Sequence, residues 1–116
     1  MATVVVNLEQ GKPRVDAAMT KLKLELSTLR RIGVKTVKII HGYGSTGTGG
    51  AIRDAVRQFL CDQMNNHRIR FFCPGECFGP FENMGRQLVE KMPALHQDPD
   101  WGRQNEGITM VILRSK

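Results

Sequence analysis

The first 40 residues alternate between two hydrophobic periodicities, and this alternation constrains the fold more than any other feature. Residues 3–8 are short and β-branched, as in a buried strand. Residues 13–33 carry apolar side chains at helical spacing, with Pro13 near the expected helix start and Gly33 as its stop. Residues 35–40 return to a β-rich pattern. This order favours two parallel strands joined by a right-handed crossover through the helix.

The rest of the chain continues the pattern. A second helix is expected after residue 50, a third strand over 67–73 and a closing strand over 108–113. Residues 74–104 separate the last two strands, and a helix over 81–92 is expected within them. We therefore predict an α/β fold, a two-layer sandwich with a four-stranded mixed sheet and two main helices, in the order β-α-β-α-β-insertion-β. Residues 1–116 would form one domain whose insertion covers an edge or face of the sheet.

Composition excludes several classes of protein. With 17 Lys and Arg against 11 Asp and Glu, the net charge is +6, which favours a polyanionic partner. The 41% hydrophobic and 24% charged residues argue against wholesale disorder and fibrous repeats. No apolar run approaches the roughly 20 residues that cross a bilayer. Because the first residues also lack the features of a secretory signal, we expect a cytoplasmic protein that does not bind membranes.

The three cysteines favour neither a disulfide scaffold nor a metal site. Cys61, Cys73 and Cys77 are an odd and small number, which a reducing compartment tolerates. The Cys73-x3-Cys77 spacing lacks the second pair that a tetrahedral metal needs, with only His67 and His96 nearby. We therefore predict no metal ligands among them.

Five glycines between residues 41 and 50 stand where a strand ends and a helix begins. Such a turn collects unpaired backbone N–H groups and the positive end of the helix dipole, which favours phosphate. The spacing Gly44-x4-Gly49 is that of a P-loop, but Gly50 and Ala51 stand where Lys and Ser or Thr would be needed. A literal Gly-x-Gly-x-x-Gly starts at Gly42, but it follows the second strand, and no acidic residue ends the next one. An NTPase and a dinucleotide site are both disfavoured.

A nucleic-acid backbone is the remaining ligand. Arg53 and Arg57 lie four residues apart on the helix that starts at the loop and would extend the positive site by one turn. Arg68 and Arg70, two apart on an expected strand, would face one side of the sheet. Tyr43 would stack on a base or sugar, or simply pack. The alternative for each arginine is an ordinary solvated surface position.

The stretch from Ile39 to Val56, which includes His41-Gly42-Tyr43-Gly44 and a later Gly-Ala-Ile-Arg, resembles the His-Gly-x-Gly signature of the Smr (small MutS-related) domain family. The order of strands and helices is also similar, outside roughly residues 74–104. The resemblance implies a sandwich similar to the carboxy-terminal domain of a bacterial translation initiation factor, and it implies DNA or RNA binding, with nicking in several members. The candidate nucleic-acid-binding residues are Gly42, Tyr43, Gly44, Gly47, Gly49, Arg53 and Arg57.

The first Smr signature, Leu-Asp-Leu-His-Gly, is altered. Here Asn7 stands at the acidic position and Glu9 at the histidine, with Gln10 inserted before the glycine. Asn is no general base, and Glu matches His poorly near pH 7. His41 has two possible roles. It either donates a hydrogen bond to a phosphate or protonates the leaving oxygen of a phosphodiester, or it holds the shape of the loop by hydrogen bonds. The candidate catalytic residues are thus His41 and Glu9. They would serve an endonuclease whose activity is weak or lost, with Mg²⁺ or Mn²⁺ as an optional cofactor.

A protein-interaction module is the alternative from another class. Under this hypothesis, the inserted segment mediates homodimerisation or docking on a partner. Its apolar residues are Phe78, Phe81, Met84, Leu88 and Met92.

Overall fold

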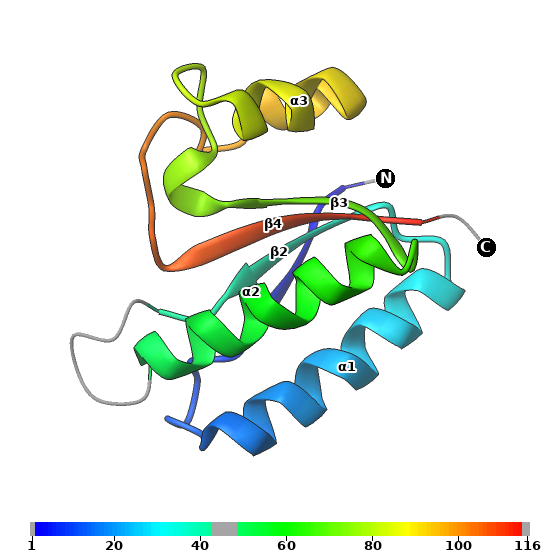
Figure 1. The fold of residues 1–116 in the computed structure, drawn as a ribbon, viewed down its shortest axis with the longest axis vertical. Helices are drawn as coiled ribbons and strands as arrows, with labels where there is room; N and C mark the ends of the chain where they lie inside the picture. The colour runs from blue at the N-terminus through cyan, green and yellow to red at the C-terminus, as the bar shows by residue number, and fades with distance from the viewer. Residues whose placement is uncertain (1, 43–48, 115–116) are drawn as a thin grey trace.

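A computed structural model describes residues 2–42 and 49–114, and within these ranges four strands form one mixed sheet with helices on both faces (Figure 1). The strands are β1 (Val4–Asn7), β2 (Thr36–Ile40), β3 (Ile69–Pro74) and β4 (Ile108–Leu113). The helices are α1 (Val15–Arg31), α2 (Gly49–Asn65) and α3 (Asn83–Lys91), with short 3-10 helices η1 (Gly75–Cys77) and η2 (Pro93–Gln97). The predicted α/β class and the mixed four-stranded sheet are confirmed.

The strand order across the sheet is β1-β2-β4-β3. β1 is parallel to β2, with Val6 opposite Ile39, as the strand-helix-strand pattern predicts. β4 is antiparallel to both of its neighbours, β2 and β3. All six residues of β4 are buried, because this central strand has neighbours on both edges and cover on both faces.

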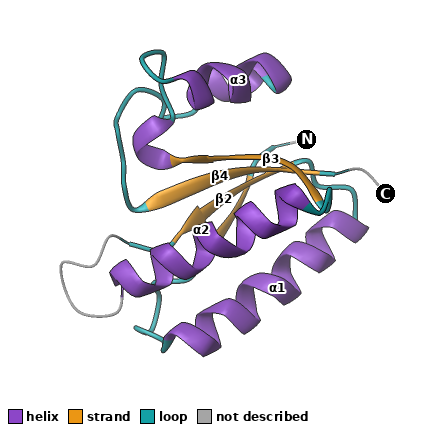
Figure 2. Ribbon diagram, in the orientation of Figure 1, coloured by secondary structure: helices purple, strands orange, loops and turns teal. Residues whose placement is uncertain are grey.

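Helices α1 and α2 cover one face of the sheet (Figure 2). Their apolar stripes place Leu22 and Leu60 fully inside the core, against Val37 and Ile39 of β2. Burying each leucine side chain stabilises the fold by roughly 2 kcal/mol. Gly33 ends α1 with φ +90°, the left-handed conformation that a helix stop favours.

The insertion covers the opposite face, where it adds a partial third layer (Figure 2). Phe78 and Leu88 pack with Met110 of β4 in a second core. Phe78 also meets Trp101 edge to face, with ring centroids 5.2 Å apart. Gly85 of α3 is obligatory, because a Cβ there would collide with the backbone oxygens of Cys77 and Gly79. Within the part of the chain that is described, no helix is long and apolar enough to cross a membrane.

The expectation that Arg68 and Arg70 share one side of the sheet is wrong. Arg68 lies in the bend before β3 and lines a groove with Phe59 of α2. Arg70 lines a different hollow with Met92, on the face that the insertion covers. The physical reason is that β3 starts only at Ile69 and its pairing with β4 shifts register between Ile69 and Phe71, so the alternation of the pleat does not extend to Arg68.

Candidate functional site

The parallel strands β1 and β2 end at the same edge of the sheet, and the candidate residues of both motifs follow them there. Leu8 N–H donates to the Ile40 carbonyl at 2.7 Å, which carries the pairing one residue beyond β1. The Asn7 side-chain oxygen accepts from the backbone N–H of Glu9 at 2.8 Å and of Gln10 at 3.1 Å. Asn7, at the position of the acidic residue in the Smr signature, therefore shapes the turn that carries Glu9.

Glu9 and Gly42 lie against each other across this edge. Gly42 has φ +75°, and a Cβ built on it would lie 2.5 Å from Glu9 Oε2. The left-handed φ favours glycine here, and the exposed Glu9 carboxylate would have to shift to make room for a Cβ. The structure therefore brings the exposed Glu9 next to the His-Gly motif, as expected for the ends of neighbouring parallel strands.

His41 is fully buried, and both of its ring nitrogens have partners. Nδ1 lies 2.7 Å from the Gly42 carbonyl oxygen, and Nε2 lies 2.8 Å from Thr109 Oγ1. Because a carbonyl only accepts, Nδ1 carries the proton, and neutral Nε2 then accepts from the Thr109 hydroxyl. Arg57 Nε donates to the same Thr109 oxygen at 3.3 Å. The hydrogen bonds therefore form a series with one direction: Arg57 donates to Thr109, Thr109 donates to His41, and His41 donates to the Gly42 carbonyl.

The pKa of His41 lies below its ordinary value of 6.5. Burial is the main cause, because it penalises the charged ring, and the positive charges of Arg57 and Arg53 add to it. The hydrogen bond to Gly42 opposes this shift without cancelling it. His41 is therefore neutral at pH 7, in agreement with the direction of its hydrogen bonds.

Arg57 is held by an ion pair. Its Nη1 and Nη2 donate to the two carboxylate oxygens of Glu76 at 2.8 and 2.7 Å, the bidentate geometry that suits a guanidinium. Nη2 also lies 3.3 Å from the Ile108 carbonyl oxygen. Burial alone would raise the pKa of Glu76, but hydrogen bonds from Arg57 outweigh it and lower the pKa. Sequence reasoning missed Glu76, since no local pattern links residue 76 to residue 57.

Arg53 lies near the start of α2, whose first turn carries no acidic residue. Its side chain is 26% exposed, and its Nε lies 3.6 Å from the Asp54 carboxylate, a weak and largely exposed contact. Gly49 is the first residue of α2. Three other predicted contacts, Tyr43, Gly44 and Gly47, fall outside the described residues.

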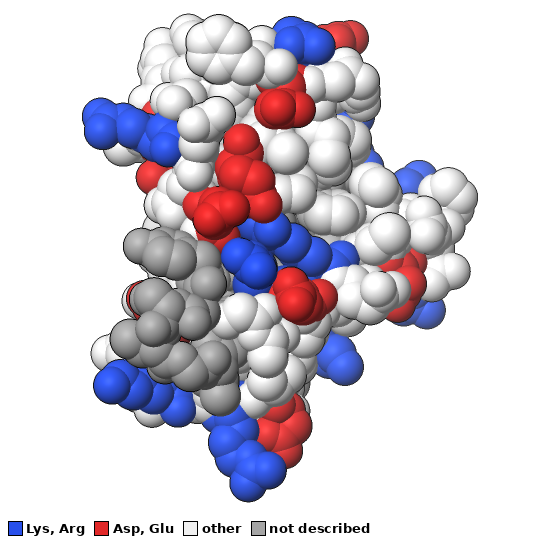
Figure 3. Space-filling view, turned by 60° about the vertical axis from the view of Figure 1, so that its left-hand side comes forward, with Lys and Arg blue, Asp and Glu red and all other residues white. Residues whose placement is uncertain are grey.

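Charges of both signs are mixed on the side of the molecule where α2 begins. Figure 3 shows basic and acidic side chains next to one another there. Both arginines of α2 have an acidic partner, Arg53 in Asp54 and Arg57 in Glu76. Among residues 2–42 and 49–114, no three His, Cys, Asp or Glu side chains converge as ligands for a metal ion.

The fold and this edge define a class of protein, a small α/β domain whose parallel strands end at a His-Gly turn leading into the second helix. A family model for the Smr domain matches residues 10–77, more than half of the 116 residues, and the chain belongs to this family. Smr domains are in general associated with nucleic-acid binding and nicking endonuclease activity. The crystal structure of the Smr domain of Thermus thermophilus MutS2 is similar in fold, with TM-score 0.59, 23% identity, and coverage of 96% of this chain and 98% of that one. No curated protein matches the chain.

Proposed function

We propose that this chain binds the backbone of DNA or RNA at the edge where β1 and β2 end, with Arg53 and the start of α2 as its positive elements. The observation that carries the proposal is the anchoring of Gly42. Its carbonyl is held by His41, and its backbone has a left-handed φ of 75° at the end of β2. The start of α2 and Arg53 then offer backbone N–H groups and a guanidinium to a phosphate.

In this proposal His41 and Arg57 are positioning residues. Both nitrogens of His41 are engaged within the domain, and Arg57 is held by Glu76 and Thr109. They hold the turn at Gly42 in place, while Arg53 is the guanidinium that a phosphate reaches. The packing of Phe78 and Leu88 on the chain's own sheet counts against the alternative of an interaction module built from the inserted segment.

Binding is tested by fluorescence anisotropy with labelled duplex DNA, branched DNA and RNA. Replacing one phosphate contact should cost about eightfold in affinity at 0.1 M salt, from counterion release. We expect this loss in Arg53→Gln and no more than a twofold change in Arg86→Gln, an exposed arginine of α3, on the other face of the sheet from α2 (Figure 2). Equal affinities for wild type and Arg53→Gln would contradict the proposed site.

A second candidate function is nicking, favoured by the Glu9 carboxylate lying against Gly42. A carboxylate at the edge that holds a phosphodiester is a group able to accept a proton from attacking water. The test is conversion of supercoiled plasmid to its nicked form, with and without Mg²⁺ or Mn²⁺, by wild type, Glu9→Gln and the control Glu90→Gln. Nicking that survives Glu9→Gln unchanged would remove Glu9 from the reaction.

A further inference from the structure

The basic side chains of the described residues fall into two groups, those with acidic partners and those without. Lys38 is held between Asp98 and Asp100 at 2.7 and 2.6 Å, and Arg57 by Glu76. The cations around a groove between α1 and α2 have no ion-pair partner among the described residues. At this groove, several such cations lie together with no acidic residue among the residues that line it.

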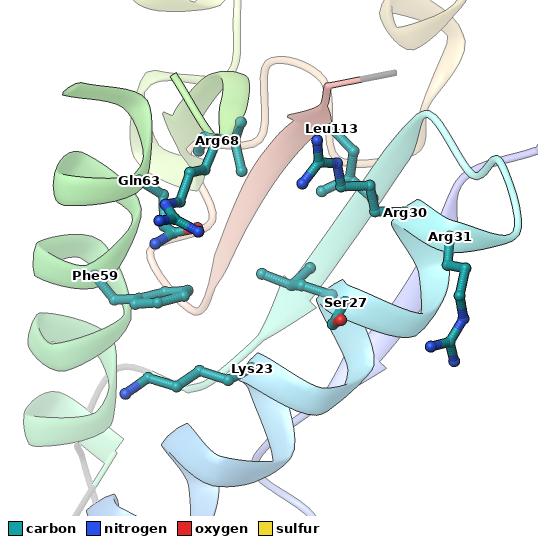
Figure 4. A pocket seen from close by; sticks show the side chains of 10 residues that line it. Lys23, Ser27, Arg30, Arg31, Phe59, Gln63, Arg68 and Leu113 are labelled. Atoms are coloured by element: carbon teal, nitrogen blue, oxygen red, sulfur yellow. The ribbon is translucent and has the colours of Figure 1, made fainter. Parts of the chain in front are cut away.

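The groove is a hollow of about 460 Å³ between the two helices (Figure 4). Lys23 and Arg30 reach it from α1, Phe59 from α2, and Arg68 from the bend before β3, while Arg31 points outward at its rim. Gln63 and Ser27 add polar groups, and no acidic residue lines it. Lys23 Nζ lies 5.4 Å from the centre of the Phe59 ring, which holds the ammonium beside an aromatic side chain of the groove.

The position of two of these cations has an ordinary structural explanation, but that of the others does not. Arg30 and Arg31 lie in the last turn of α1, where positive charge is favoured by the helix dipole. Lys23 lies in the middle of α1, and Arg68 comes from a different segment. Their convergence gathers like charge without compensation, an arrangement that a bound polyanion would stabilise.

The basic surface extends past the groove. A neighbouring hollow of about 420 Å³ is lined by Lys35, Arg70 and Arg114, again without an acidic residue, and Leu113 lines both. Both hollows therefore meet at the end of β4. These cations form a band around this end of the sheet, from the helix face to the face that the insertion covers, and such a band suits a long polyanion better than a single small anion.

This band lies at the end of the sheet opposite to Gly42. The N–H of Leu113 donates to the carbonyl of Lys35, which precedes β2, whereas Gly42 follows β2. The two places are therefore separated by the length of that strand, roughly 17 Å. They are distinct surfaces, and a single phosphate cannot reach both.

We propose that the groove between α1 and α2, lined by Lys23, Arg30 and Arg68, is a second binding site for nucleic-acid backbone. The site rests on the proposed function and extends it, so that the domain holds two separate stretches of phosphodiester. Lys23 and Arg30 are seven residues apart on α1, roughly 10 Å along its axis. One strand of a duplex carries about three phosphates over that length. Arginine adds a planar fork that binds phosphate through two hydrogen bonds.

The test compares the double variant Arg30→Gln with Arg68→Gln against the matched double Arg86→Gln with Arg103→Gln, which removes the same charge from exposed positions elsewhere. Anisotropy with labelled duplex and single-stranded oligonucleotides is measured between 50 and 200 mM salt. Loss of two phosphate contacts should weaken duplex binding about 60-fold at 0.1 M salt and reduce the salt slope by about two. The matched double should change affinity by less than about threefold, because charges beyond roughly 10 Å are screened.

The outcomes separate this site from the one at Gly42. If Arg53→Gln weakens binding and the groove variant equals its matched control, the second site is overturned and the proposed function stands. If only the groove variant weakens binding, the groove is the binding site and the edge at Gly42 is not. Wild type that binds no nucleic acid overturns both. A poly-glutamate peptide provides the last comparison. If it binds wild type as tightly as the oligonucleotide does and loses affinity equally in the groove variant, the ligand of the groove is an acidic protein and the proposal of nucleic acid is overturned.

Discussion

The hydroxyl of Thr109 donates to His41 Nε2 at 2.8 Å inside the domain, where neither side chain is exposed to solvent. This contact joins the central strand β4 to the end of β2. Because Arg57 donates to the same hydroxyl oxygen, the pair also connects the turn at Gly42 with the ion pair to Glu76. The shape of the edge at Gly42 therefore depends on a threonine that lies 68 residues from His41 along the chain.

Thr109→Val should break this chain of hydrogen bonds without changing the size of the side chain. His41 Nε2 and Arg57 Nε each lose a partner, and the expected loss in the free energy of unfolding is about 2 kcal/mol. Thr20→Val is the control, because Thr20 is exposed and its hydroxyl donates to the Asp16 carbonyl one turn earlier in the same helix. Its urea midpoint should stay close to wild type. Imidazole ¹⁵N shifts of the wild type should report His41 protonated at Nδ1. A His41 protonated at Nε2 would contradict the proposed direction of these hydrogen bonds.

The stability of the fold should fall as the pH drops below about 6.5, the ordinary pKa of histidine. Since the folded pKa of His41 is lower, the unfolded chain binds more protons in this range, so protonation favours unfolding by up to about 1.4 kcal/mol per pH unit. Glu76 and Asp100 also have lowered pKa values, but from 4.5 and 3.8, so their effect comes at more acidic pH. Urea unfolding between pH 7.5 and 5.0 measures the slope. A His67→Gln, His96→Gln background, in which His41 is the only histidine, should retain it.

Local periodicity predicted the elements, and parallel strand geometry predicted one contact of the site. Leu22 and Leu60 lie inside because each belongs to an apolar helical stripe, and Glu9 lies beside Gly42 because parallel strands end at one edge. The partner of Arg57 could not be predicted. Glu76 reaches it only because β3 pairs with β4 and η1 then turns toward α2, which depends on contacts distant in sequence. The groove between α1 and α2 was missed for the same reason, since helix packing creates it.

Gly42→Ala and Gly11→Ala form a matched pair of glycine substitutions. Both glycines have left-handed φ angles, +75° and +80°, but a Cβ at Gly11 meets nothing within 4 Å while one at Gly42 meets Glu9. Each variant should lose about 1 kcal/mol through backbone strain, and Gly42→Ala somewhat more. In a Glu9→Ala background the two losses should become equal. An excess loss that persists in this background would show that Glu9 is not the neighbour that matters.

The inserted segment should behave as part of the core, and substitutions at Leu88 and Phe81 separate this from a role in dimerisation. Leu88 of α3 is fully buried, so Leu88→Ala should lose about 2–5 kcal/mol on urea unfolding. Phe81 is 81% exposed in the same segment, and Phe81→Ser should change stability by less than about 0.5 kcal/mol. Light scattering should give the same mass for wild type and Phe81→Ser. A wild-type dimer that becomes a monomer in Phe81→Ser would instead place an interface on this segment, because only an exposed aromatic side chain in contact with a partner has that effect while leaving the fold intact.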